Sequence, residues 1–194
     1  MNAETHNIQL IAGLGNPGNE YERTRHNAGF WFIDQLLEQY NLTLKSEAKF
    51  LGDTVRLSTP SGNVWLLKPT TFMNRSGQSI ARLAQFYKIK VSQILVVHDE
   101  LDLSPGIAKL KQGGGHGGHN GLRDSIAQLG KDFYRLRLGI GHPGAKEQVV
   151  GYVLGKTPKS EKTLIDSSID KAIASIELIL QGDMQKAMNQ LHSK

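Results

Sequence analysis

Short apolar runs alternate along this chain with segments in which apolar residues recur at helical spacing. Strands are predicted over residues 8–14, 54–57, 64–67, 94–97, 107–111 and 135–140. Helices are predicted over residues 28–40, from a point after Asn74, over 122–129 and from Pro158 onward, with a break at Gly182. This alternation predicts an α/β fold of three layers (α/β/α), in which helices cover a twisted, mixed and mostly parallel central sheet.

The 194 residues suffice for one domain with a sizeable core, and no internal repeat or change of composition divides them. We therefore predict a single domain over residues 1–194, which ends in C-terminal helices over residues 159–192. The inward face of these helices is predicted to consist of Ile165, Ile169, Ile173, Ile176 and Leu180. Upstream of them, Pro143 and Gly144 predict a mobile lid loop over residues 142–155.

The composition excludes some classes of protein and favours a polyanionic partner. There is no cysteine, which excludes thiol nucleophiles, disulfides and cysteine-ligated metals. The apolar runs are too short to span a bilayer, and residues 1–6 show no secretory pattern, so a cytoplasmic location is expected. The formal net charge is +5, and seven basic residues gather within one stretch: Lys109, Lys111, Arg123, Lys131, Arg135, Arg137 and Lys146. Such a gathering favours a substrate that carries phosphates.

Six of the nine residues from Gly113 to Gly121 are glycine, and the other three are His116, His119 and Asn120. Neither helices nor strands gain from such a run, because glycine loses the most backbone freedom on folding. We interpret it as a loop whose backbone approaches a ligand closely, or which holds imidazole and amide groups in fixed directions. A flexible linker would favour serine and proline over histidine and asparagine.

Residues 13–18 match the pattern Gly-x-Gly-x-x-Gly directly after the first predicted strand. In dinucleotide-binding folds this pattern needs a helix that starts at the glycines and an acidic residue at the end of the next strand. Residues 19–26 carry no apolar stripe, and Asp34, at about the right offset, falls inside a predicted helix. The pattern therefore favours a tight turn, which would place the amide of Asn16 at the crevice where α/β folds bind ligands.

A histidine and an aspartate are both expected at this ligand-binding edge of the sheet. His26 precedes the first predicted helix, and Asp99 follows the apolar run 94–97. Together they can form a base and its orienting carboxylate, which fixes the imidazole tautomer. Ser76 lacks the Gly-x-Ser-x-Gly elbow of serine hydrolases, so water is expected as the nucleophile.

Three asparagines lie in predicted turns or at predicted helix starts, namely Asn16, Asn74 and Asn120. Side-chain amides at such positions can donate to a developing oxyanion or hold a peptide carbonyl. Alternatively, Asn74 and Asn120 simply cap the helices that follow them, which is the more usual role of an isolated asparagine at such a position.

Two other functions use the same residues. A metal site could combine His116 and His119 with His26, Asp99 or Glu100, although glycines on both sides rule out a stable helix that would align the first two. A non-catalytic RNA-binding protein would explain the basic residues, but not the pairing of His26 with Asp99.

Several motifs follow one another over essentially the whole chain. They are residues 13–18, Tyr21, and residues 24–29, 69–77, 98–102, 113–122 and 135–144. In sequence and in order, these motifs closely resemble those of bacterial peptidyl-tRNA hydrolase. The resemblance implies hydrolysis of the ester that joins a peptide's C-terminus to the 3′ ribose of tRNA, which recycles tRNA from peptidyl-tRNA that has left the ribosome early. It also implies a monomer of one α/β domain with a mixed sheet, and neither cofactor nor metal.

The resemblance also implies a role for individual residues. It implies that His26 is the general base toward water and that Asp99 holds it. Asn16 is implied in telling blocked from free aminoacyl groups, and Asn74 and Asn120 in binding the substrate and the attacking water. The residues implied at the peptidyl-tRNA 3′ end, the 5′ phosphate and the acceptor arm are Tyr21, Phe72, Met73, His119, Lys111, Arg137 and Lys146.

Overall fold

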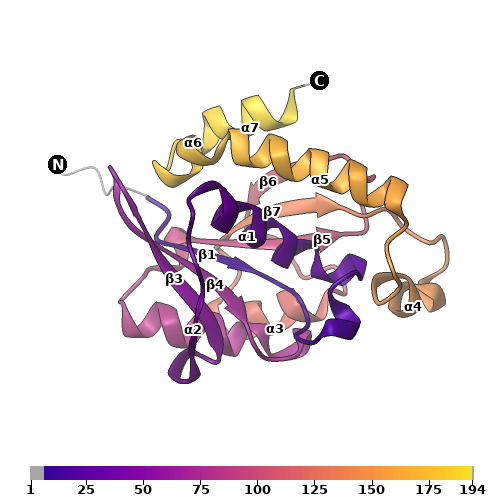
Figure 1. The fold of residues 1–194 in the computed structure, drawn as a ribbon, viewed down its shortest axis with the longest axis horizontal. Coiled ribbons are helices and arrows are strands. Elements are labelled where there is room, and N and C mark those ends of the chain that lie inside the picture. Colours follow the sequence, from indigo (N-terminus) through magenta and orange to yellow (C-terminus); the bar gives the residue numbers. More distant parts are fainter. Residues whose placement is uncertain (1–6, 194) are drawn as a thin grey trace.

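The protein, here a computed structural model that describes residues 7–193, is built on one seven-stranded sheet of order β2-β3-β4-β1-β5-β7-β6 (Figure 1). The strands are β1 (Leu10–Gly13), β2 (Lys45–Glu47), β3 (Gly52–Thr59), β4 (Gly62–Pro69), β5 (Ile94–Glu100), β6 (Ala108–Gln112) and β7 (Tyr134–Gly139). β1 pairs in parallel with β4 and β5, and β5 with β7. β3 and β6 run antiparallel to their neighbours. The sheet is therefore mixed and mostly parallel, as predicted.

Helices cover both faces of this sheet, which gives the predicted three layers. The helices are α1 (Ala28–Gln39), α2 (Ser76–Phe86), α3 (Asn120–Leu129), α4 (Val149–Val153), α5 (Lys159–Ala174), α6 (Ile176–Leu180) and α7 (Met184–His192). α2 and α3 pack side by side on one face, and α1, α5 and α7 lie on the other (Figure 1). Within residues 7–193, no helix has both the length and the apolar character that crossing a bilayer requires.

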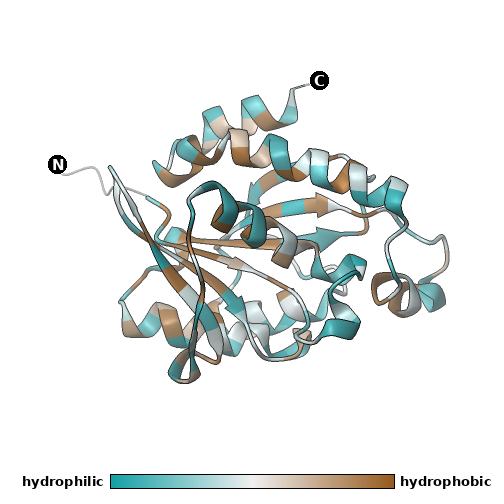
Figure 2. Cartoon of the chain, viewed as in Figure 1, coloured by the Kyte–Doolittle hydropathy of each residue, from teal (hydrophilic) through white to brown (hydrophobic). Residues whose placement is uncertain are grey.

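The central strands supply the core of both faces, and Figure 2 shows their apolar character. Successive side chains of a strand point to opposite faces. Ile11 accordingly belongs to the cluster under α1 and α5, whereas Leu10 and Ala12 belong to the cluster under α2 and α3. The five residues predicted to face inward in the C-terminal helices are all buried.

Each predicted strand and helix corresponds to an observed element, but one boundary changes the interpretation of the site. β5 continues through His98 and Asp99, and both side chains are buried. The strand is therefore longer than the predicted range 94–97, and Asp99 lies within it rather than after it. Apart from the short 3-10 helices, two elements have no predicted counterpart, namely β2 and α4, and α4 lies inside the segment 142–155 that was predicted as a loop. Residues 1–6, which were considered for a targeting signal, lie outside the described residues.

The turn after β1 lacks the geometry of a dinucleotide fingerprint. The next long helix begins only at Ala28, and the chain between forms two 3-10 helices, Asn19–Tyr21 and Arg25–Asn27. A Cβ on Gly13 would lie 2.3 Å from the carbonyl oxygen of Gly29 in α1. Gly13 is therefore needed for the close approach of β1 to α1 rather than for a pyrophosphate.

Candidate active site

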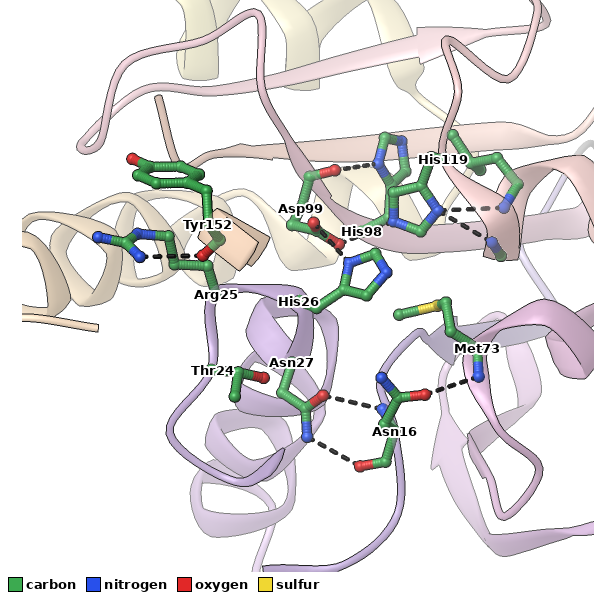
Figure 3. A network of polar contacts seen from close by, with 12 residues as sticks. Asn16, Thr24, Arg25, His26, Asn27, Met73, His98, Asp99, His119 and Tyr152 are labelled. Carbon is green, nitrogen blue, oxygen red and sulfur yellow. Dashed lines mark hydrogen bonds and ion pairs between the residues drawn. The ribbon is translucent and has the colours of Figure 1, made fainter. Parts of the chain in front are cut away.

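Four residues singled out by the sequence analysis converge at the carboxyl ends of β1 and β5, namely Asn16, His26, Asp99 and His119 (Figure 3). Asn16 follows β1, and Asp99 is the last residue but one of β5. His26 lies in the 3-10 helix Arg25–Asn27, directly before α1, and His119 is the N-cap of α3. Because β1 and β5 are parallel neighbours, their carboxyl ends meet at one edge of the sheet, where α/β folds bind ligands.

The carboxylate of Asp99 accepts one hydrogen bond from each of two imidazoles. Nδ1 of His26 lies 2.8 Å from Oδ2, and Nε2 of His119 lies 2.7 Å from Oδ1. The backbone N–H groups of Gly121 and Leu122 donate to Nδ1 of His119, at 3.1 and 3.2 Å. That nitrogen must accept, so the proton of the neutral ring lies on Nε2 and points at Asp99.

These contacts leave Nε2 of His26 available as a proton acceptor, because Nδ1–H is the donor to Asp99. Within residues 7–193, Nε2 has no hydrogen-bond partner, and His26 lines the cavity of the site. Burial lowers the pKa of His26, but the charge of Asp99 and its hydrogen bond outweigh this and raise the pKa above the usual 6.5. Burial by itself would raise the pKa of Asp99, yet His26 and His119 hold it well below its usual value.

Asn16 is fixed through both its side chain and its backbone. Its Oδ1 accepts from the backbone N–H of Met73 at 2.7 Å, which leaves the Nδ2 hydrogens free to donate. The side chain of Asn27 accepts from the backbone N–H of Asn16 at 2.8 Å and donates to its carbonyl oxygen at 3.0 Å. In Figure 3 the amide nitrogen of Asn16 points toward His26.

The other two asparagines do not cap the helices that follow them. The side chain of His119 caps α3, whereas Asn120 is the first residue of that helix and its Oδ1 accepts from Arg123 at 3.0 Å. Asn74 lies in a 3-10 helix before α2, and no side chain of the described residues caps α2. Asn74 and Asn120 are both exposed and line the cavity. Their amides are therefore available to a ligand.

The cavity measures about 660 Å³ and is lined by both polar and apolar side chains. Its lining includes His26, Asp99 and the three asparagines, together with Phe72, Met73 and His119. Val150 of α4 and Leu154, which directly follows this helix, also line the cavity. Phe72 is 58% exposed and Val150 68% exposed, so that large apolar groups remain uncovered around the polar site. Such a cavity suits a ligand with both apolar and hydrogen-bonding parts.

The glycine-rich run forms a loop that ends in the N-cap His119, and no residue of it before Asn120 is helical. Arg135, which is buried, donates to the carbonyl oxygens of Gly114 and Gly115 and so fixes the loop to β7. A Cβ on Gly121 would lie 2.5 Å from Sδ of Met73. The backbone therefore does make a close approach at Gly121, but its partner is Met73 of the same chain and not a ligand.

The predicted tRNA-contacting residues are only partly brought together. Lys146 lines the cavity, and Tyr21 reaches its rim through an edge contact with Phe72, with ring centroids 6.2 Å apart. Lys111 and Arg137 lie outside the cavity on the neighbouring strands β6 and β7. Nε of Arg137 lies 2.7 Å from Oε1 of Glu100, and Glu100 lines the cavity.

The basic residues of β6 and β7 share one face of the sheet. Lys109 is opposite Arg137, and Lys111 is opposite Arg135, so each pair points to the same side. Burial, together with the charges of Arg137 and Arg135, lowers the pKa of Lys111. The pairing of β6 with β7 therefore gathers four basic side chains on one face of the sheet.

Within the described chain, His26, Asp99 and His119 form one group close enough to ligate a metal ion. Their nitrogen and oxygen atoms are joined at hydrogen-bond distances of 2.7 and 2.8 Å. Tetrahedral ligands of zinc would lie about 3.3 Å apart, given metal–ligand bonds of about 2.0 Å. His116, predicted as a ligand in the metal interpretation, is not part of this group. The geometry is therefore that of a hydrogen-bonded relay.

Comparison with known proteins identifies the class of enzyme. The family model of peptidyl-tRNA hydrolase matches residues 10–194. The chain belongs to the peptidyl-tRNA hydrolase family. Peptidyl-tRNA hydrolase of Pectobacterium atrosepticum is 60% identical over 188 residues, which cover 96% of both chains. That of Vibrio parahaemolyticus is 56% identical over 191 residues and 97% of both chains. A crystal structure of peptidyl-tRNA hydrolase from Acinetobacter baumannii gives a TM-score of 0.94 at 54% identity, over 98% of this chain and 97% of that one.

Membership in the peptidyl-tRNA hydrolase family establishes a hydrolase that acts on the ester bond of peptidyl-tRNA, as the resemblance implied, and a role in translation. It also makes the non-catalytic RNA-binding interpretation wrong. The family resemblance placed Asn27 and Arg25 inside a motif but gave them no role, although both are buried and hydrogen-bonded at the site. Their position beside His26, in a polar run before a helix, was the available signal.

Proposed function

We propose that His26 is the general base of this hydrolase. Nε2 of His26 takes a proton from a water molecule, and the water oxygen attacks the ester carbonyl carbon. The bond to the 3′ oxygen of the ribose then breaks, and the imidazolium returns its proton to that oxygen. The observation that carries this proposal is the 2.8 Å contact between Nδ1 of His26 and Asp99, which leaves Nε2 free at the cavity. General base catalysis supplies about 10²–10⁴ in rate.

Asp99 orients this base and stabilises the imidazolium that forms. It remains ionised, because its pKa is held well below the usual value by His26 and His119. Nε2–H of His119 donates to the other carboxylate oxygen of Asp99. The proton is on Nε2 because two backbone N–H groups donate to Nδ1 of the same ring. The carboxylate therefore has one oxygen committed to His119 and the other to His26.

The three asparagines hold the substrate by its polar groups. The free Nδ2 of Asn16, beside His26, is suited to donate to a carbonyl of the peptide, which is how a blocked aminoacyl group would be told from a free one. The exposed amides of Asn74 and Asn120 are suited to bind the attacking water and the oxyanion, and each such donor supplies about 10²–10³ in rate.

The tRNA end lies against the apolar and basic residues around the site. Tyr21, Phe72 and Met73 receive the 3′ end, with His119 beside it, and α4 of the lid segment 142–155 closes over them. Lys111, Arg137 and Lys146 contact the phosphates of the acceptor arm, which contribute affinity without reading sequence. This mode of binding suits an enzyme that must accept many tRNAs.

We further propose that the enzyme acts as a monomer without metal or cofactor, in the cytoplasm where translation produces its substrate. The decisive experiment compares release from N-acetyl-aminoacyl-tRNA and from unblocked aminoacyl-tRNA, in chelator, by wild type and His26→Ala. We expect rapid release from the blocked substrate only, lost in the variant while tRNA binding stays nearly intact. Loss of activity in chelator that zinc restores would instead support metal catalysis, and a joint loss of binding and turnover would make His26 structural.

A further inference from the structure

Helix α4 forms part of the cavity wall but is too short to hold itself in place. It consists of Val149–Val153, and isolated helices of this length are not stable in water. Val150 and Leu154 expose their apolar side chains beside the cavity that they line. Contacts with the rest of the chain must therefore decide where this wall lies.

Arg25 supplies the main polar anchor of α4. Its Nη1 donates to the carbonyl oxygen of Tyr152 at 3.0 Å, and its guanidinium carbon lies 3.8 Å from the centre of the Tyr152 ring. Its Nε pairs with Glu161 of α5 at 2.9 Å, and the side chain is only 9% exposed. The Tyr152 hydroxyl in turn donates to the carbonyl oxygen of Ile140 at 2.6 Å. Figure 3 shows Arg25 and Tyr152 together, next to the turn that carries His26.

The chain just before His26 is bonded to the chain just after α4 at two further points. Thr24 forms an antiparallel bridge with Lys156. The backbone N–H and the hydroxyl of Thr157 both donate to the carbonyl oxygen of Arg23, at 2.8 and 3.0 Å. Residues 23–25, which directly precede His26, are therefore bonded to Tyr152 in α4 and to residues 156–157 just after it.

We propose that Arg25 is a positioning residue that couples the placement of α4 to that of His26. The proposal rests on the role of His26 as general base. A substrate that packs against Val150 and Leu154 fixes α4 and, through Tyr152, the guanidinium of Arg25. Since Arg25 is adjacent to His26 in a 3-10 helix, the same contacts hold the base toward the cavity.

This coupling needs the planar shape and the several donors of the guanidinium group, and not only its charge. It donates in two directions, to Tyr152 and to Glu161, while its flat face covers the tyrosine ring. Lysine keeps the charge but lacks the planar fork. If Arg25 served only to neutralise Glu161, lysine would replace it without loss.

The test compares Arg25→Met and Arg25→Lys with wild type, with His26→Ala included. Arg23→Met is the matched control, because Arg23 contacts Thr157 through its backbone carbonyl oxygen, which methionine keeps, while its exposed side chain carries the same charge two residues away. The readouts are kcat, KM and the acid limb of the pH profile on N-acetyl-aminoacyl-tRNA, and hydrogen exchange of amides 149–157. Thermal unfolding corrects for the folded fraction.

We expect Arg25→Met to lower kcat about 10-fold and to raise KM about 5-fold, with Arg25→Lys between it and wild type. Amides 149–157 should exchange faster in both variants, and Arg23→Met should resemble wild type. A purely structural role would reduce only the active fraction, so unchanged KM, acid limb and exchange in folded Arg25→Met would overturn the proposal. An equal effect of Arg23→Met would overturn it too.

The two proposals can fail separately. Wild-type turnover by His26→Ala would refute the general base, whatever Arg25 does. Normal exchange of amides 149–157 in Arg25→Met would refute the coupling even if His26→Ala is inactive.

Discussion

Replacing Asp99 by asparagine tests the proposed relay most sharply, because the structure dictates how the new amide must lie. His119 keeps its proton on Nε2, since the N–H groups of Gly121 and Leu122 occupy Nδ1. The oxygen of the introduced amide must therefore face His119, and its NH₂ group must face His26. Nδ1 of His26 then becomes an acceptor, and its proton moves to Nε2. That tautomer has no lone pair at the cavity with which to accept a proton from water.

The expected loss is correspondingly large. In serine hydrolases the same change leaves the geometry intact and lowers kcat about 10⁴-fold through the wrong tautomer. General base catalysis as a whole raises the rate about 10²–10⁴-fold. We therefore expect Asp99→Asn to lower kcat by about 10³–10⁴ while KM changes little. The residual acid limb should move to lower pH, because Asp99 is what raises the pKa of His26 above 6.5.

The assay is release of N-acetyl-amino acid from N-acetyl-aminoacyl-tRNA between about pH 5 and pH 9. His119→Asn in the Asp99→Asn background is the informative control, since asparagine still caps α3 but leaves the amide at position 99 free to turn. Its oxygen can then face His26, so the double variant should recover at least about 10-fold of the lost kcat. Near-wild-type activity of Asp99→Asn, or no recovery in the double variant, would refute the reasoning.

Three other changes have defined outcomes. Asn27→Ala leaves a buried N–H and C=O of Asn16 unpaired at about 1–3 kcal/mol each, so the free energy of unfolding in urea should fall by about 2–6 kcal/mol; a loss under about 1 kcal/mol would contradict this. Burial, followed by the charge of His119, lowers the pKa of His98 to about 3. The unfolded chain therefore binds a proton near pH 6.5 that the folded one does not. Below that pH His98 reduces the free energy of unfolding by up to about 1.4 kcal/mol per pH unit. The difference in the free energy of unfolding between wild type and His98→Asn, measured in urea, should therefore fall between about pH 7 and pH 5. Lys111→Gln should make the slope of log binding constant against log salt concentration for tRNA shallower by about 0.9. Lys171→Gln, on an exposed part of α5, should leave this slope unchanged. A slope for Lys111→Gln equal to that of wild type would remove Lys111 from the phosphate contacts.

Most of the fold could be predicted, because burial leaves a pattern of apolar residues in the sequence of the core strands and helices. The apolar run 94–97 is continuous because β5 is covered on both faces, and the isoleucines of α5 recur at helical spacing because one side of that helix is buried. β2 could not be predicted in this way. Its residues Lys45–Glu47 are polar, and they join the sheet through backbone pairing with β3 alone. α4 has five residues, too few for a period to show.

Some features of the site could likewise be predicted from the sequence, and others could not. His26 and Asp99 could be paired from the sequence, because β5 ends and α1 begins at the ligand-binding edge of the sheet. The contacts of Asp99 with His119 and of Asn16 with Asn27 could not, since they depend on how two loops fold over that edge. Sequence reasoning offered Asn120 as a cap of α3, and the structure gives that position to His119.

One consequence of this arrangement is that a backbone feature determines the chemistry of a side chain. The N–H groups of Gly121 and Leu122 set the tautomer of His119, and that tautomer leaves a single oxygen of Asp99 for His26. Gly121 can take this position only without a Cβ, which would lie 2.5 Å from the sulfur of Met73. Met73 also donates its N–H to Asn16. The glycine-rich run thus connects the relay with the residue proposed to select blocked substrates, because the start of α3 must pack against Met73 for both to be in place.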